Sequence, residues 1–256
     1  MSAHLPLLLM SFAVGILIGI TSMGGAALMA PFLILVLGVR PVTAVGTDLV
    51  YGAITKIVGA WVHLRQGTVD LAAVRRLAMG SVPGGLMGSL AVVLLPHYTH
   101  NAEHYVRTAI GVLLIAVAVI LLARILVRLP EGPAGPPGGR FLYERGTVIW
   151  GWVVGFCVGA TSVGSGSLMA PFLMLLYPSK TSKVVGTDVF HAAILVSVTG
   201  LVHGISGGVE WNLVPVLLAG SIPGVLAGSR LAPLVPARPL RIGLAAVLLW
   251  TGYQML

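Results

Sequence analysis

A short stretch of glycine, serine and threonine that interrupts an apolar run occurs twice in this sequence, and it constrains the fold more than any other feature. The first copy, Gly19–Leu33, reads GITSMGGAALMAPFL, and the second, Gly159–Leu173, reads GATSVGSGSLMAPFL. The offset of 140 residues (159 − 19) continues without a gap to Ser89 and Ser229, and about 30 of roughly 70 aligned pairs are identical. The chain therefore contains an internal repeat, and its fold must accommodate the same polar break twice.

The composition places these breaks in a membrane. Only 9% of the 256 residues are charged, whereas about 25% is usual for soluble domains. A helix needs about 20 residues to cross a bilayer. Several apolar runs come close to this length, such as Leu5–Ile20, Ile110–Ala123 and Ile242–Leu256. A transmembrane β-barrel is excluded because the sequence does not alternate with a period of two. We therefore expect an all-α polytopic membrane protein.

The net charge of +8 does not indicate nucleic-acid binding, because Lys and Arg lie mostly in or beside the short segments between apolar runs. Cys157 is the only cysteine, so no intramolecular disulfide can form. The N-terminus lacks a basic region and a clear cleavage site, so Leu5–Ile20 is expected to be retained and not removed as a signal peptide.

Each half contains five apolar segments, and a Pro/Gly-rich stretch separates the halves. We assign residues 1–128 to the first transmembrane repeat, 129–145 to a linker and 146–256 to the second repeat. The segments span roughly Leu5–Ser22, Gly24–Leu37, Pro41–Leu64, Leu71–Leu95 and Tyr105–Val127 in the first half, and Thr147–Ser162, Gly166–Tyr177, Thr181–Ile205, Trp211–Val235 and Leu240–Leu256 in the second.

Basic residues indicate how the halves are oriented, because they concentrate in cytoplasmic loops. If the second segment returns to the side where the first began, only Arg40 and Arg107 face one side. Twelve residues then face the other: Arg65, Arg75, Arg76, Arg124, Arg128, Arg140, Arg145, Lys180, Lys183, Arg230, Arg238 and Arg241. A single crossing made of the first two segments would instead split them about seven against seven. The count favours two inverted-topology repeats, with both termini on the outer, periplasmic side and the linker cytoplasmic.

The second segment of each half is too short for a full crossing. Gly24–Leu37 would extend about 21 Å as a helix, whereas the hydrocarbon core is about 30 Å thick. Pro31 also removes a hydrogen bond within it. We expect a broken or re-entrant hairpin in each repeat, which gives eight to ten segments in all.

The polar breaks are candidate walls of a substrate site, because irregular backbone at membrane depth survives only inside protein or beside water. The helix that follows each break would direct free N–H groups and a positive dipole end at an anion, and two such ends would frame a central pocket. Alternatively, the glycines only permit close helix packing. The residues assigned to substrate binding on this ground are Ser22, Gly24, Gly25, Ser162, Gly164, Ser165 and Gly166.

A second repeated motif, Gly-Thr-Asp, contributes Asp48 and Asp188 near the starts of the third segments. A carboxylate within a membrane is costly and faces the bundle interior or a partner. Each aspartate is either a proton or ion relay or a structural cap that accepts hydrogen bonds from the exposed amides of the broken segment. The adjacent Thr47 and Thr187 are assigned to the substrate site.

Lys56 is the only basic residue deep inside an expected span, and Val196 occupies its equivalent position. It either attracts an anion and pairs with Asp188, or extends along its helix toward the Arg65 side. Tyr51 and its equivalent His191 lie three residues beyond the aspartates, on the same helical face, and are assigned as further donors to an oxyanion.

The repeated Gly-Ser-x-Pro-Gly-x-x-x-Gly motif at residues 80–88 and 220–228 is typical of closely packed helices. Enzyme signatures are absent: there is no His-Glu-x-x-His, no cysteine pair for a metal and no phosphate-binding Gly-x-x-x-x-Gly-Lys. We therefore expect no enzymatic activity, no metal and no cofactor, and transport energy from a gradient or from a partner protein.

The duplicated Gly-x-x-Ser-x-Gly motif with its Pro-x-Leu ending, together with Gly-Thr at 46–47 and 186–187 and Gly-Ser-x-Pro-Gly at 80–84 and 220–224, resembles the sulfite exporter TauE/SafE family of permeases. The resemblance covers almost the whole chain. It implies transport of sulfite, organosulfonates or related sulfur anions across a bacterial inner membrane. The family is usually drawn with four plus four spans, whereas the charge count favours five segments in each half.

These expectations combine into a secondary transporter, an exporter of small sulfur-containing anions that alternates access between inverted repeats. The alternatives are a passive anion channel with the same filter, a permease for another small anion, or a membrane enzyme or scaffold that transports nothing. Paired unwound segments in lipid argue against the last, because a scaffold has no use for them.

Overall fold

The computed structural model describes residues 4–21, 26–126, 139–166, 168–169, 172–173, 181–231 and 237–256. Within these ranges the chain forms nine α-helices and no strand. They are α1 (His4–Thr21), α2 (Ala26–Leu35), α3 (Pro41–Arg65), α4 (Leu71–Tyr98), α5 (Ala102–Leu126), α6 (Gly139–Thr161), α8 (Thr181–Ile205), α9 (Leu213–Leu231) and α10 (Ala237–Met255).

Local chemistry accounts for several helix ends. Pro41 starts α3, where its missing N–H costs nothing, and Asp70 caps α4 by accepting hydrogen bonds from the amides of Ala72 and Ala73 at 3.1 Å. A glycine of positive φ lies two residues after the last residue of both α3 and α8. The angle is 66° at Gly67 and 72° at Gly207. These two glycines are 140 residues apart (207 − 67), so the repeat extends to the way the helices end.

The boundaries differ from expectation mainly at the linker. The helix α6 begins at Gly139, so residues 139–145, expected to be part of the linker, are helical. The last proline of the linker is Pro137. Between Gly139 and Gly146 the chain has no residue that would break a helix. Of the second short segment, Gly166–Tyr177, only residues 166, 168–169 and 172–173 are described, so most of the expected hairpin of the second half lies outside the described residues.

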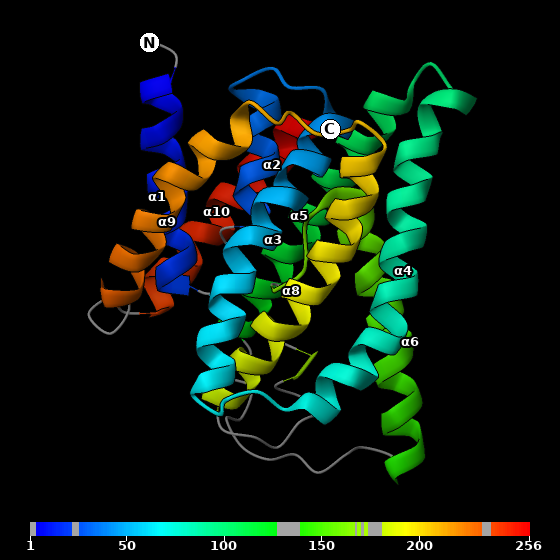
Figure 1. Ribbon diagram of the computed structural model, residues 1–256, viewed down its shortest axis with the longest axis vertical. Coiled ribbons are helices and arrows are strands. Elements are labelled where there is room, and N and C mark those ends of the chain that lie inside the picture. The colour runs from blue at the N-terminus through cyan, green and yellow to red at the C-terminus, as the bar shows by residue number, and fades with distance from the viewer. Residues whose placement is uncertain are drawn as a thin grey trace.

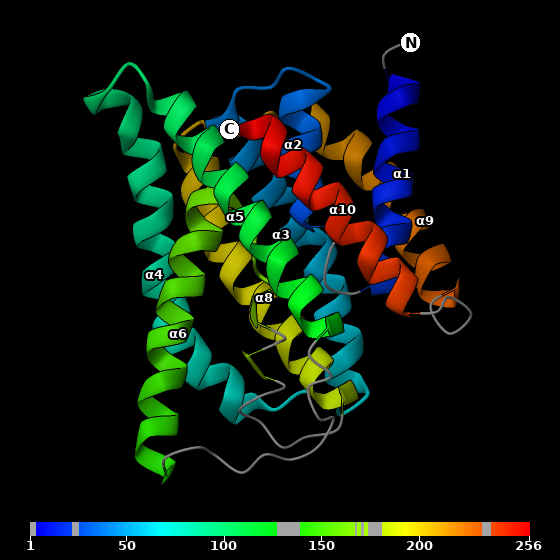
Figure 2. The ribbon, with the colours of Figure 1, turned by 180° about the vertical axis from the view of Figure 1, so that it is seen from behind.

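Helices of one half pack mainly against those of the other. The closest pairs are α1 with α9, α4 with α6, α3 with α8 and α5 with α10 (Figures 1 and 2). In Figure 1 the helices α1, α3 and α5 run downward, whereas α6, α8 and α10 run upward. The N- and C-termini lie at the upper end, and α5 ends and α6 begins at the lower end.

Glycines make two of these contacts possible. A Cβ on Gly84 of α4 would lie 2.2 Å from the carbonyl oxygen of Trp152 on α6, and one on Gly224 of α9 would lie 2.3 Å from that of Phe12 on α1. Both pairs are related by the same offset of 140 residues. The packing interpretation of the Gly-Ser-x-Pro-Gly-x-x-x-Gly motif is thus confirmed.

The outer surface fits a bilayer. Three described helical stretches are long and apolar enough to cross one, Leu71–Tyr98, Ala102–Ala123 and Lys183–Ile205, and shorter apolar stretches run over Leu7–Ile18, Leu213–Gly228 and Ile242–Met255. Large apolar side chains such as Ile57 and Val58 of α3 and Val112 and Val119 of α5 are more than half exposed. An apolar surface of this kind is stable in lipid and unfavourable in water. The chain is therefore a helical membrane protein.

Candidate functional site

The end of α6 meets the middle of the bundle through Ser162. Its amide donates to the carbonyl oxygen of Val158 at 2.7 Å, and its φ of 62° turns the chain out of the helix. A positive φ is uncommon for serine and is held here by its surroundings. The Ser162 hydroxyl donates to Oδ2 of Asp48 on α3 at 2.7 Å, and both residues are buried. Asp48 of the first half therefore accepts a hydrogen bond from the polar break of the second half.

Lys56 reaches the same break from one side. Its ammonium is hydrogen-bonded to the hydroxyl of Ser165, which is buried. The carboxyl groups of Asp188 and Asp48 lie within electrostatic range of this ammonium. Lys56 therefore points into the interior and does not extend toward the Arg65 end of α3.

The two aspartates each keep one oxygen free. Oδ1 of Asp48 and Oδ1 of Asp188 are buried without a hydrogen-bond partner among the described residues. Asp48 accepts from a hydroxyl at the break and, within the described residues, from no backbone amide. For Asp48, bracing of the break by Oδ2 is therefore compatible with proton or ion binding at Oδ1.

Tyr51 and His191 contact serines of the opposite half. Nε2 of His191 lies 2.7 Å from Oγ of Ser81 on α4, and both side chains are buried. The equivalent pair, Tyr51 and Ser221 of α9, lies close together without a hydrogen bond of good geometry. Nδ1 of His191 has no partner among the described residues. Sequence reasoning missed both serines as site neighbours, although their repeated Gly-Ser-x-Pro-Gly motif marked the positions.

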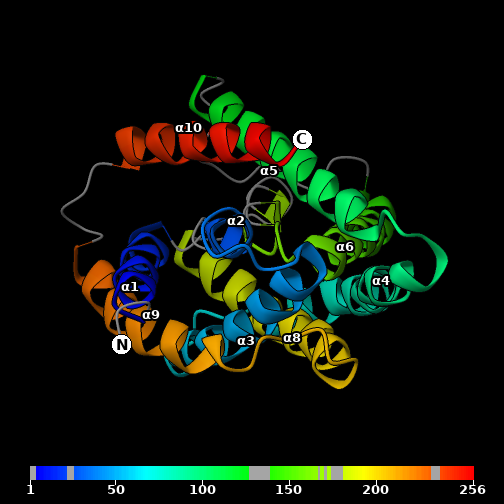
Figure 3. The ribbon, with the colours of Figure 1, turned by 90° about the horizontal axis from the view of Figure 1, so that it is seen from above.

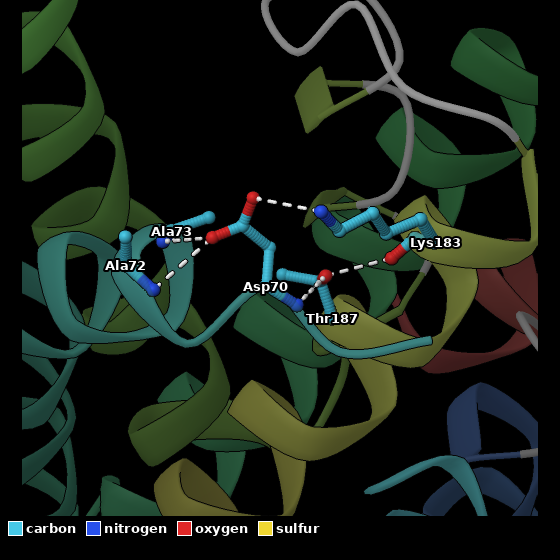
Figure 4. A network of polar contacts seen from close by, with 5 residues as sticks. All are labelled: Asp70, Ala72, Ala73, Lys183 and Thr187. Carbon is cyan, nitrogen blue, oxygen red and sulfur yellow. Dashed lines mark hydrogen bonds and ion pairs between the residues drawn. The ribbon is translucent and has the colours of Figure 1, made fainter. Parts of the chain in front are cut away.

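Thr47 and Thr187 are occupied with loops. The Thr187 hydroxyl donates to the Lys183 carbonyl oxygen at 2.6 Å and accepts from the Asp70 amide at 2.9 Å (Figure 4). The Thr47 hydroxyl likewise donates to the Thr43 carbonyl oxygen at 2.7 Å and accepts from the Glu210 amide at 2.9 Å. Thr187 therefore fastens the loop that follows α3, and Thr47 fastens the loop that follows α8.

The glycines of the same motif permit this fastening. A Cβ on Gly46 would lie 2.1 Å from the carbonyl oxygen of Gly208, and one on Gly186 would lie 2.5 Å from that of Thr68. At the lower end Lys183 adds an ion pair with Asp70 at 3.6 Å (Figure 4). The repeated Gly-Thr-Asp motif thus combines a loop contact at one residue with a buried carboxylate at the next.

The remaining predicted residues are placed in part. Ser22, Gly24 and Gly25 lie outside the described residues. Gly164 has a φ of 112°, and its carbonyl oxygen accepts from the Leu168 amide at 3.2 Å. Gly166 is partly exposed at the end of the described break. In the part of the chain that the structure describes, no cluster of three His, Cys, Asp or Glu side chains could hold a metal ion.

Taken together, α3, α8 and the break after α6 bring one ammonium, two carboxylates and two serine hydroxyls into the interior of the bundle. An ammonium and hydroxyl donors are the groups that bind a small anion. Carboxylates with a free oxygen can carry a proton or bind a cation. The arrangement is therefore suited to hold an anion next to an exchangeable positive charge.

Comparison with known proteins identifies the family of the chain. The sequence model of the family described as sulfite exporter TauE/SafE matches residues 7–255. The chain is 40% identical over 251 residues to the probable membrane transporter protein YjnA of Bacillus subtilis (strain 168), covering 98% of this chain and 98% of that protein. It is 28% identical over 265 residues to YunE of the same strain, also a probable membrane transporter protein, covering 97% and 94%. No solved structure matches the chain.

Proposed function

The chain belongs to the sulfite exporter TauE/SafE family of membrane transporters, and from this premise we propose that it is a secondary transporter that exports small sulfur-containing anions such as sulfite or organosulfonates. Its relatives are named as transporters, which fits a role without catalysis. The observation that carries the proposal is the part-buried contact of Lys56 with the buried Ser165, next to Ser162 and Asp48 at the end of α6.

We propose that the two halves are inverted repeats. The opposite directions of α1, α3 and α5 on one hand and α6, α8 and α10 on the other support this, as does the location of both termini at one end (Figure 1). The exchanged pairs α1 with α9 and α4 with α6 also support it, because a twofold relation between halves turns one pair into the other. The distribution of basic residues supports a periplasmic location of the termini and a cytoplasmic location of the opposite end.

The charges of the interior site give a reason for coupling. Asp48, Asp188 and Lys56 together carry one net negative charge when all three are ionised. A further anion would be repelled in this low-dielectric interior. A proton on either carboxylate makes the site neutral and leaves the ammonium and the serine hydroxyls to hold the anion. We therefore propose that Asp48 and Asp188 couple anion movement to a proton or ion.

The substrate set follows from the repeat. Ser162, Gly164, Ser165 and Gly166 supply hydroxyl and backbone groups from the second half. Their first-half counterparts Ser22, Gly24 and Gly25 are included in the proposal on the sequence repeat alone. Tyr51 and His191 border the set, and Thr47 and Thr187 serve it by fastening the loops that must open and close for alternating access.

Sulfite counterflow in proteoliposomes tests the proposal. Ser162→Ala, alone and combined with Ser22→Ala, is expected to lower flux at least tenfold, because a hydrogen bond to a charged group contributes about 1.5–3 kcal/mol. The matched control is Ser206→Ala, since that exposed serine bonds only within α8, to the Val202 carbonyl oxygen. Undiminished flux in the Ser162→Ala protein would overturn the site assignment. Flux without stimulation by sulfite on the far side would identify a passive channel.

A further inference from the structure

A second cluster of positive charge lies at the upper end of the bundle, away from the interior site. The end of α2, the turn into α3 and the start of α5 enclose a cavity of about 410 Å³, and its lining includes Arg40, Glu103, His104 and Arg107. Figure 3 looks onto this end, where α2, α3, α5 and α10 come together.

The cavity collects the basic residues of this end of the chain. Of the fifteen Lys and Arg residues, the charge count assigns twelve to the opposite side and Lys56 to the interior, which leaves Arg40 and Arg107 (15 − 12 − 1 = 2). Both line this one cavity, although they come from different helices. Two isolated guanidinium groups on an otherwise sparsely charged face repel each other unless an anion or a carboxylate lies between them.

Glu103 does not fill that role. Its Oε2 accepts a hydrogen bond from the Val42 amide at 3.0 Å, so the carboxylate caps the start of α3. Within the described residues neither guanidinium forms an ion pair, since the ion pair found there joins Lys183 to Asp70. The cavity thus has a net charge of +1 with His104 neutral, and more if His104 is protonated.

Arg107 is held in place by one hydrogen bond, and one of its N–H donors has no partner among the described residues. Its Nη2 donates to the carbonyl oxygen of Gln254 at the end of α10 at 2.7 Å. Its Nε is buried and has no partner among the described residues. A buried unsatisfied donor is costly, and an oxyanion that accepts from it removes that cost. Guanidinium groups also suit oxyanions and sulfonates in particular, because their planar fork bonds two oxygens at once.

We propose that this cavity is a second binding site for a small oxyanion or sulfonate, held between Arg40 and Arg107 at the end of the bundle that carries both termini. That the ligand of this cavity is also the transported anion rests on the proposed function. That the cavity binds an oxyanion does not rest on it. On the proposed topology this end is periplasmic and is the exit side of an exporter, so the site holds the anion there as it leaves. When sulfite is supplied from that side in counterflow, the site lowers the concentration needed for half-maximal flux.

Binding can be measured apart from transport. The purified protein in detergent is titrated with sodium sulfite at constant ionic strength, with sodium chloride as the balancing salt, and its thermal stability is followed. The Lys56→Met background removes the interior cation, so sulfite stabilisation there reports on the cavity. Adding Arg40→Gln to this background is expected to raise the Kd about tenfold, which is the effect of losing one charge-assisted hydrogen bond.

Two further variants make the outcome specific. Arg107→Lys keeps the charge but not the fork and is expected to weaken sulfite binding severalfold. Arg75→Gln is the matched control, because Arg75, like Arg40, is exposed and lines a cavity, but at the opposite end. The Arg75→Gln variant should bind sulfite as the Lys56→Met parent protein does. Equal stabilisation of the Arg40→Gln and parent proteins, or no stabilisation of the parent, would overturn the proposal.

Transport then separates this inference from the proposed function. In proteoliposomes Arg40→Gln is expected to raise the KM for sulfite about tenfold from one side while kcat stays within twofold. An unchanged KM from both sides overturns the role of the cavity in binding the transported anion at this end. Full flux in the Lys56→Met protein would refute the interior site and not the cavity. The sulfite titration would then still show whether the cavity binds an oxyanion.

Discussion

The loops fastened by Thr187 and Thr47 allow a prediction that tests the repeat at the level of single hydrogen bonds. Thr187→Val keeps the shape of the side chain and removes one hydroxyl. The Asp70 amide then loses its acceptor at 2.9 Å, while the cap on α4 and the ion pair with Lys183 remain. The lower loop, residues 66–70, should therefore detach from α8 more often.

The magnitude follows from the partners that are left. A part-buried amide without an acceptor costs about 1 kcal/mol, near the low end of the range for buried groups. The ion pair retains little of the contact, because Lys183 and Asp70 side chains are 45% and 31% exposed and such pairs contribute about 0–1 kcal/mol. A loss of about 1–1.4 kcal/mol raises the population of the detached loop about fivefold to tenfold.

Hydrogen exchange followed by mass spectrometry measures this opening directly. In the Thr187→Val protein the peptide spanning residues 66–72 should exchange fivefold to tenfold faster, and the peptide spanning residues 207–213 should be unchanged. Thr47→Val is the matched control and should give the reverse pattern, because its hydroxyl serves the Glu210 amide. Equal loosening of both loops in either variant, or no change in either, would refute two separate fastenings.

Three other changes have defined outcomes. Gly84→Ala should lower the melting temperature by several degrees in detergent, because its Cβ would lie 2.2 Å from the Trp152 carbonyl oxygen and force α4 and α6 apart. Gly243→Ala, where a Cβ meets nothing within 4 Å, should leave stability equal or about 1 kcal/mol higher, and a loss as large as that of Gly84→Ala would contradict the packing argument. Ser81→Ala should shift the imidazole nitrogen resonances of His191 in selectively ¹⁵N-labelled protein, because the 2.7 Å contact to Nε2 is lost; an unchanged spectrum would exclude that hydrogen bond.

The sequence alone predicted the features that depend on local composition. Hydropathy and Gly/Pro punctuation located the helices to within a few residues, except that α6 begins at Gly139 and not near Thr147. The repeat predicted that Gly84 and its counterpart would be contact positions, because small residues every four positions create one flat face. A polar break in an apolar run marked Ser162 and Ser165 as interior residues for a similarly local reason.

The contacts across the halves could not be predicted in this way. Lys56 and Ser165 are 109 positions apart, and Ser81 and His191 are 110 apart. Periodicity indicates which face of a helix is buried, but it does not indicate which helix lies against it. The role of Thr47 was missed for the same reason, since its partner amide is 163 positions away on the other half. The predicted inverted repeats leave open which helices of the two halves lie against each other, and only the spatial arrangement supplies those pairs.

Sulfite counterflow into proteoliposomes with Lys56→Met, compared with Lys56→Arg, tests the central claim most directly. If the partly buried Lys56 ammonium beside Ser165 holds the transported anion, Lys56→Met should lower flux by about a hundredfold or more, because an anion at the site would face two carboxylates without a cation. Lys56→Arg, which keeps the charge, should retain measurable flux. Parental flux in the Lys56→Met protein would contradict the account.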